Sequence, residues 1–282
     1  MKSTVRILVM AAVMLGFAAC GDDDDRNDGR EGKLNITLWG EDYISEGIPA
    51  EDDDGFSDGW SLKFDIFAIN LGKLRVAEGN KSPVVDTDTF KIYDLAKYQE
   101  PEIIESFVVP AAKYTNTGYS IAAATADSQA GNADAAVVTK MKENGWSIFA
   151  EGTATHKDGR NVSFSWGFDS TTRYEPCHSE GDLLDDDDDD DDREEDIEIT
   201  IHSDHLFMNS VAHDDPDLLF ELVASAANDD KHIGNEELKA LNIENSDDYD
   251  TGSYNLPTMW EYMLHMSKTL GHIDGEGHCE MN

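Results

Sequence analysis

Eight consecutive aspartates at residues 185–192 constrain the fold of this chain more than any other feature of its sequence. Such a run repels itself and cannot be packed into an apolar core. We therefore expect an acidic disordered linker at residues 181–196, with folded blocks on either side of it at residues 33–180 and 197–282. The acidity is general, because 60 Asp and Glu stand against 21 Lys and Arg and give a formal charge of −39. A surface of that charge repels nucleic acid, so we expect no nucleic-acid partner.

The first block alternates apolar and polar residues in short runs, which predicts β-strands with one buried face. Two such runs lie at residues 34–39 and 60–71, and the second changes phase after Ile66, which predicts a β-bulge. Asp158-Gly159 stands between two further runs and predicts a hairpin. Further strands are expected at 90–93, 103–109, 118–124, 146–155 and 162–168, and a helix at 133–143. This spacing predicts an antiparallel β-sandwich over residues 33–180.

The second block changes from strand to helix, which makes the expected fold class α+β. Residues 197–202 alternate as a strand does, and Asp215-Pro216 is a typical helix start before Leu218, Leu222 and Ala226. A second helix is expected at 236–241 and a third at 258–270. In the third helix three methionines fall at helical spacing, where packing in the core is a commoner role than contact with a metal or cofactor.

The N-terminus has a basic start, an apolar run at residues 7–19 and small residues before Cys20, the plan of a secretory signal peptide. The run is too short to cross a bilayer. Phe17-Ala18-Ala19-Cys20 resembles the lipobox of bacterial lipoproteins, although Leu is commoner where Phe17 stands. The resemblance implies cleavage of residues 1–19, diacylation of Cys20 and an envelope location, with Gly21 favouring the outer membrane. The alternative is plain secretion with an incidental Cys20.

The residues after the expected cleavage site continue as a polar, glycine-rich stretch, which predicts a flexible tether at 20–32. Cleavage removes Lys2 and Arg6, which leaves 19 basic against 60 acidic residues and a formal charge of −41. Two other cysteines remain, Cys177 and Cys279. An even number of cysteines in an oxidising compartment predicts a disulfide, with metal ligation as the alternative.

Two short segments of the first block resemble secreted β-sandwich modules of the methanobactin-associated copper-binding type. They are Val109-Pro110-Ala111-Ala112-Lys113-Tyr114 and Phe164-Ser165-Trp166-Gly167-Phe168. The resemblance lies in the pattern of the strands. Since His156 is the only histidine within residues 33–170, copper binding does not carry over.

Residues 226–237, read as AANDDKHIGNEE, resemble a degenerate EF-hand loop. Asn228, Asp230 and Glu237 take the third, fifth and twelfth positions, and they are the calcium ligands that the resemblance implies. Ala226 replaces the first Asp, and Lys231 stands where a Gly makes the sharp turn. The alternative is a helix–loop–helix that keeps its Ile233 contact without an ion.

Eight of the nine histidines lie between His178 and His278, and two short segments concentrate them. His202 and His205 form one candidate pair, and His272 and His278 form the other. Imidazoles with nearby carboxylates suit zinc, copper or nickel, so these four are candidate transition-metal ligands. His202 and His205 share a face only if the chain leaves the strand there as a turn. The alternative is that they act as hydrogen-bonding groups on the surface or between the domains.

The sequence contains no G-x-S-x-G elbow, Walker loop, dinucleotide fingerprint or H-E-x-x-H pair. We therefore expect a non-enzymatic envelope lipoprotein whose partner is the membrane through its lipid, with a divalent cation bound in the C-terminal module. One alternative is an adhesin-like or scaffold protein that binds a protein or glycan through an exposed platform of Trp39, Trp60, Trp146 and Trp166, although their alternate placement in the strands favours the core for most of them. Another is a zinc-dependent hydrolase with Asp204 as its base.

Overall fold

The computed structural model describes residues 31–50, 55–178, 194–213, 215–275 and 277–282. The expected signal peptide, Cys20, most of the tether and the run of aspartates lie outside these residues. No helix in the described part of the chain is long and apolar enough to cross a bilayer.

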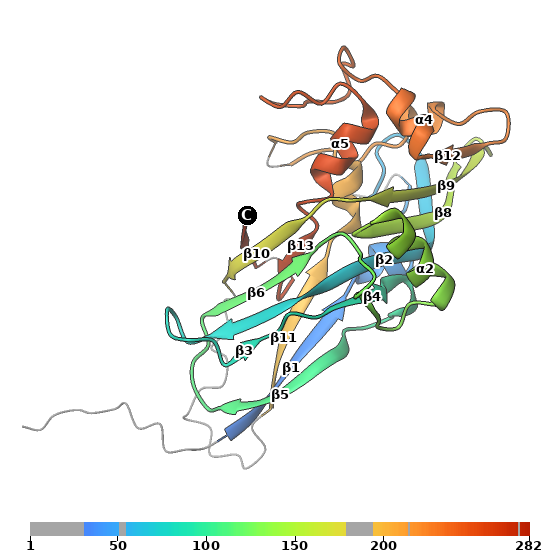
Figure 1. Ribbon diagram of the computed structural model, residues 1–282. Helices are drawn as coiled ribbons and strands as arrows, with labels where there is room; N and C mark the ends of the chain where they lie inside the picture. The colour runs from blue at the N-terminus through green and yellow to red at the C-terminus, as the bar shows by residue number, and fades with distance from the viewer. Residues whose placement is uncertain (1–30, 51–54, 179–193, 214, 276) are drawn as a thin grey trace, which may run out of the picture.

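Strands dominate the fold, which confirms a β-rich α+β class (Figure 1). The smaller sheet has four strands in the order β13 (Gly271–Ile273), β11 (Glu194–Ile201), β1 (Glu31–Trp39) and β5 (Glu102–Pro110). The path of the larger, ten-stranded sheet is β12 (His232–Gly234), β9 (Asn161–Phe168), β8 (Ile148–His156), β2 (Trp60–Ala77), β6 (Asn116–Ile121), β10 (Thr172–Cys177) and β14 (Cys279–Met281). Beside this path lie β3 (Val85–Asp86), β4 (Phe90–Asp94) and β7 (Gln129–Ala130).

Short helices fill the connections between these strands. The α-helices among the described residues are α1 (Glu41–Ser45), α2 (Ala135–Asn144), α3 (Glu221–Ser225), α4 (Asn235–Ala240) and α5 (Met259–Met266). Two 3₁₀ turns are η1 (Leu95–Lys97) and η2 (Ser203–Phe207). The helix α2 lies against the larger sheet, while α4 and α5 gather near β9 and β12 (Figure 1).

Several local predictions are confirmed. The hairpin β8–β9 turns at Gly159, which has a φ of 95°. The register of β2 against β8 shifts between Phe64 and Ile66, just before the position after Ile66 where the bulge was expected. Helix α2 ends on Gly145 in the left-handed conformation. The methionines Met259, Met263 and Met266 of α5 are buried, as expected for core residues.

Strands from the C-terminal block belong to both sheets. Within the smaller sheet β11 pairs in parallel with β1, and β13 pairs with β11. Within the larger sheet β12 pairs with β9, and β14 pairs with β10. The strands β1 and β11 begin at Glu31 and Glu194, inside the ranges expected for the tether and the linker. Strands of the two blocks therefore share both sheets.

The prediction of a helix that starts at Pro216 is wrong for residues 216–220, because α3 begins only at Glu221. Leu218 instead forms β-bridges with Phe56 and Met208. The main-chain groups of this segment are thus used for tertiary pairing, which overrides the local helical pattern.

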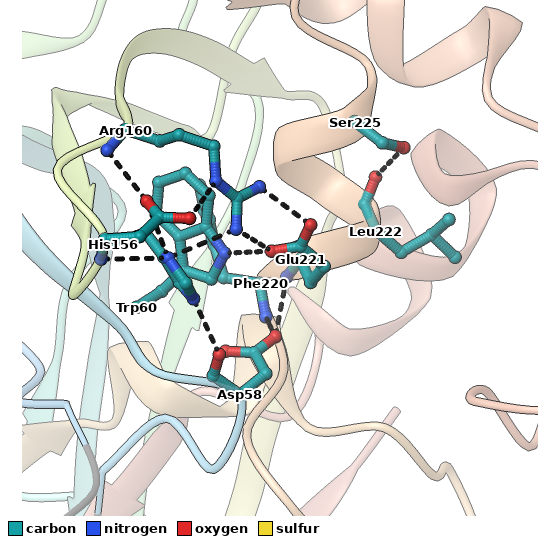
Figure 2. Close-up of polar contacts among 9 residues, drawn as sticks. Asp58, Trp60, His156, Arg160, Phe220, Glu221, Leu222 and Ser225 are labelled. Carbon is teal, nitrogen blue, oxygen red and sulfur yellow. Dashed lines mark hydrogen bonds and ion pairs between the residues drawn. The ribbon is translucent and has the colours of Figure 1, made fainter.

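A cluster of polar side chains joins the hairpin β8–β9 to α3 (Figure 2). The indole N–H of Trp60 donates to Glu221 Oε2 at 2.7 Å. The guanidinium of Arg160 donates to both carboxylate oxygens of Glu221, at 2.8 and 3.0 Å. Asp58 Oδ2 accepts the backbone N–H groups of Phe220 and Glu221 at 2.6 Å each, and so holds the start of α3.

Two of the four tryptophans expected on a platform are core residues. Trp60 and Trp166 are 1% and 0% exposed, and both belong to the main hydrophobic cluster. They cannot form an exposed binding surface, so the four-residue platform is wrong. The alternation of the strands places them on the inner face.

Cys177 and Cys279 form a disulfide, as expected. The bond links β10 to β14 across 102 residues of sequence. Both sulfurs are thereby used, so the alternative that these cysteines ligate a metal is wrong.

Candidate metal centre

The parallel pairing of β1 with β11 brings Glu41 and His202 together. Trp39 stands opposite Thr200 in the register, and the chain leaves both strands at the same edge of the sheet (Figure 1). Two residues further along each chain, Glu41 Oε2 lies 3.3 Å from His202 Nδ1. The backbone of Glu41 is left-handed there, with a φ of 54°. A non-glycine residue in that conformation carries a local energetic cost that the surrounding structure must offset.

After β11 the chain turns into the 3₁₀ element η2, which meets the condition for His202 and His205 to share a face. In a 3₁₀ turn the side chains at positions i and i+3 lie on the same side. The two rings are stacked, with their centroids 5.3 Å apart. One ligand atom each of His202, Asp204 and His205 lies within 4.8 Å of the other two.

The third ring comes from β13, in which His272 pairs with Thr200 of β11. The centroid of the His272 ring is 4.5 Å from that of His202 and 5.4 Å from that of His205. The fourth candidate, His278, has its ring 6.2 Å from that of His272. The ligand atoms of His202, Asp204 and His205 therefore lie together, the ring of His272 lies beside the two other rings, and His278 lies at the margin.

Hydrogen bonds orient two of the rings. His205 Nδ1 lies 2.9 Å from the carbonyl oxygen of Thr269, so a proton on that nitrogen is donated and Nε2 keeps its lone pair. His202 Nε2 lies 3.4 Å from the carbonyl oxygen of Gly275, which can only accept a hydrogen bond, and its Nδ1 faces the carboxylate of Glu41. A carboxylate or carbonyl behind a ligating imidazole fixes the tautomer and raises the basicity of the ring, as is common in zinc sites.

The centre is mostly shielded from solvent, since His202 is 6% exposed and Asp204 is 9% exposed. Several titratable groups so close together in a protein interior are costly unless charge is balanced among them. Three imidazoles with one carboxylate form a ligand set that suits zinc, copper or nickel.

The candidate calcium loop is closed by its own hydrogen bonds. Asn228 Nδ2 donates to Glu237 Oε1 at 3.0 Å, and Asp230 Oδ1 accepts the backbone N–H of His232 at 3.1 Å. Lys231 has a φ of 57°, the left-handed conformation that glycine favours at this position of an EF-hand loop. Ile233 is fully buried.

Sequence reasoning missed Glu41. No local motif marks this residue, because its partner follows a strand that lies far away in the sequence. The available signal was that a carboxylate stands two residues after the end of a predicted strand, behind Gly40. Comparisons with protein-family models, with curated proteins and with solved structures found no match to this chain.

Proposed function

We propose that this chain is a non-enzymatic envelope lipoprotein that binds a divalent transition-metal ion at the centre formed by His202, Asp204, His205 and His272. The observation that carries the proposal is the convergence of three imidazole rings, with centroids 4.5 to 5.4 Å apart, from two separate segments. Histidines that serve only as separate hydrogen-bonding groups on the surface would have no reason to lie this close together. The lipid anchor at Cys20, the envelope location and the sandwich arrangement of the two sheets form part of the same proposal.

A second candidate is calcium at Asn228, Asp230 and Glu237. It is favoured by one observation, the left-handed backbone of Lys231 at the position where an EF-hand loop turns. The lysine charge opposes a cation at that place, and the loop already satisfies Glu237 through Asn228 and Gly234. The His centre is therefore the stronger site.

A hydrolytic role would require an open coordination position on the metal and turnover of a substrate. An adhesin-like or scaffold role would need a surface other than one built on Trp60 and Trp166. Among the described residues neither alternative has a contact of its own in support, so we propose metal binding.

The test is metal binding by the full chain after removal of metal with a chelator. We expect zinc, copper or nickel to bind with a stoichiometry of one and to raise the melting temperature. A ligand at about 100 times its Kd stabilises the native state by about 2.7 kcal/mol. His205→Gln and His272→Gln should each abolish most of this shift. The matched control is His213→Gln, because His213 is exposed and lies outside the centre.

Calcium is the parallel arm of the experiment, with Glu237→Gln as its variant. If none of the transition metals binds or shifts the melting temperature of the wild-type chain, the proposal for the His centre fails. The proposal also fails if His213→Gln loses metal binding as completely as His205→Gln does.

A further inference from the structure

A buried metal centre needs a path by which a hydrated ion can reach it. A pocket with a volume of about 930 Å³ lies between α1 and the strands β2 and β8. Glu41 belongs to the lining of this pocket, and its carboxylate contacts His202 at 3.3 Å. Glu41 is thus shared by the pocket and the centre.

The lining has the chemistry of a cation path. Its carboxylates are those of Glu41, Asp42 and Glu46, and its one positive side chain among the described lining residues is Lys63. Hydroxyl groups come from the outward-facing Thr153 and from other lining positions on β2 and β8. A concave surface with an excess of one charge focuses ions of the opposite charge and raises their rate of association.

We propose that this pocket is the entry site through which hydrated divalent cations reach the His centre, with Glu41 as the carboxylate that passes the ion to His202. The inference rests on the proposed metal-binding function. Oxygen ligands suit the partly hydrated ion, and each water that the ion loses is replaced first by a carboxylate oxygen and then by an imidazole nitrogen. The exchange involves no redox step, because the ion keeps its charge throughout.

A path differs from a ligand in its kinetic signature. Blocking a path slows loading and release by the same factor and leaves Kd unchanged, whereas removing a ligand raises Kd. Thr153 is exposed on β8 and lines the pocket, so Thr153→Trp places a bulky ring in the pocket without altering the centre. The matched control is Val108→Trp on the edge strand β5, where the native side chain is 71% exposed.

A double variant, Asp42→Asn with Glu46→Gln, removes two negative charges from the pocket, and both substituted positions are exposed. We expect the loading rate to fall about threefold or more at low ionic strength and to approach the wild-type rate in about 1 M salt, where screening is nearly complete. The matched control is Asp127→Asn/Glu143→Gln, a pair of exposed carboxylates outside the pocket lining.

The experiment is stopped-flow loading of zinc into the apo full chain, together with release of zinc to an excess of chelator. We expect Thr153→Trp to slow both rates by one common factor of about tenfold, with Kd within about twofold of wild type. Melting of each apo variant establishes that it folds. Normal loading and release in Thr153→Trp and in the pocket charge variant would overturn the entry site while leaving the centre intact. Failure of the wild-type chain to bind zinc, copper or nickel would instead refute the centre itself.

Discussion

Reduction of the Cys177–Cys279 disulfide should destabilise the protein strongly, and the cost follows from the length of the closed loop. The two cysteines are 102 residues apart. In the chain-entropy model a loop of about 100 residues contributes about 4.7 kcal/mol at 25 °C. We expect the native pairing of β14 to survive reduction, because the backbones of Arg173 and Asn282 exchange hydrogen bonds of 3.0 and 2.9 Å. The loss therefore arises mainly in the unfolded chain, and we expect about 3 to 5 kcal/mol.

The assay is urea unfolding of the oxidised and the reduced chain, followed by tryptophan fluorescence. Cys279→Ala is the matched variant, and it should behave like the reduced wild type with or without reductant. A loss below about 1 kcal/mol would refute the reasoning, since it would mean that the reduced unfolded chain stays as compact as the oxidised one. Metal affinity should change little on reduction, because His272 is held by the pairing of β13 with β11.

Three further changes test local features of the fold by the same unfolding measurement. Arg160 lowers the pKa of the Glu221 carboxyl, so that interaction stabilises the protein at neutral pH and is lost as the pH falls through the folded-state pKa. Because the side chain is 52% exposed, Glu221→Gln should cost at most about 1 kcal/mol at pH 7 and nothing at a pH below that pKa. Gly152→Ala should cost about 1 to 3 kcal/mol, since its Cβ would meet a backbone carbonyl oxygen at 2.1 Å. Lys231→Gly should stabilise the fold by up to about 1 kcal/mol, because glycine adopts its left-handed backbone freely.

The parts of the fold that the sequence predicts correctly are those decided by neighbouring residues. Asp158-Gly159 specifies the hairpin because glycine accepts the positive φ of the turn. Gly145 ends α2 for the same reason. The helix expected after Pro216 failed because residues 216–220 pair with segments distant in the sequence, and no local pattern reports such pairing.

The residues of the candidate site also differ in whether neighbouring residues decide their placement. His202 and His205 are a local pair, and a single turn of chain decides whether they face each other. The clustering of histidines in the sequence also pointed to His272, although the order β13–β11–β1 that brings it close could not be read from its neighbours. His278 comes from the same short segment as His272, yet its ring contacts only the edge of the group.

The position of Glu41 is set by long-range strand pairing, which a local sequence pattern does not predict. Its place beside His202 depends on the parallel register of β1 and β11. In the sequence, most strands of the larger sheet lie between these two strands. His272 joins them only when β13 has paired with β11. The proposed ligand group therefore comes together only in the folded chain, and an unfolded chain offers isolated histidines in its place. Since an ion that binds only the native state stabilises it by mass action, metal binding at this centre must appear as an increase in the free energy of unfolding.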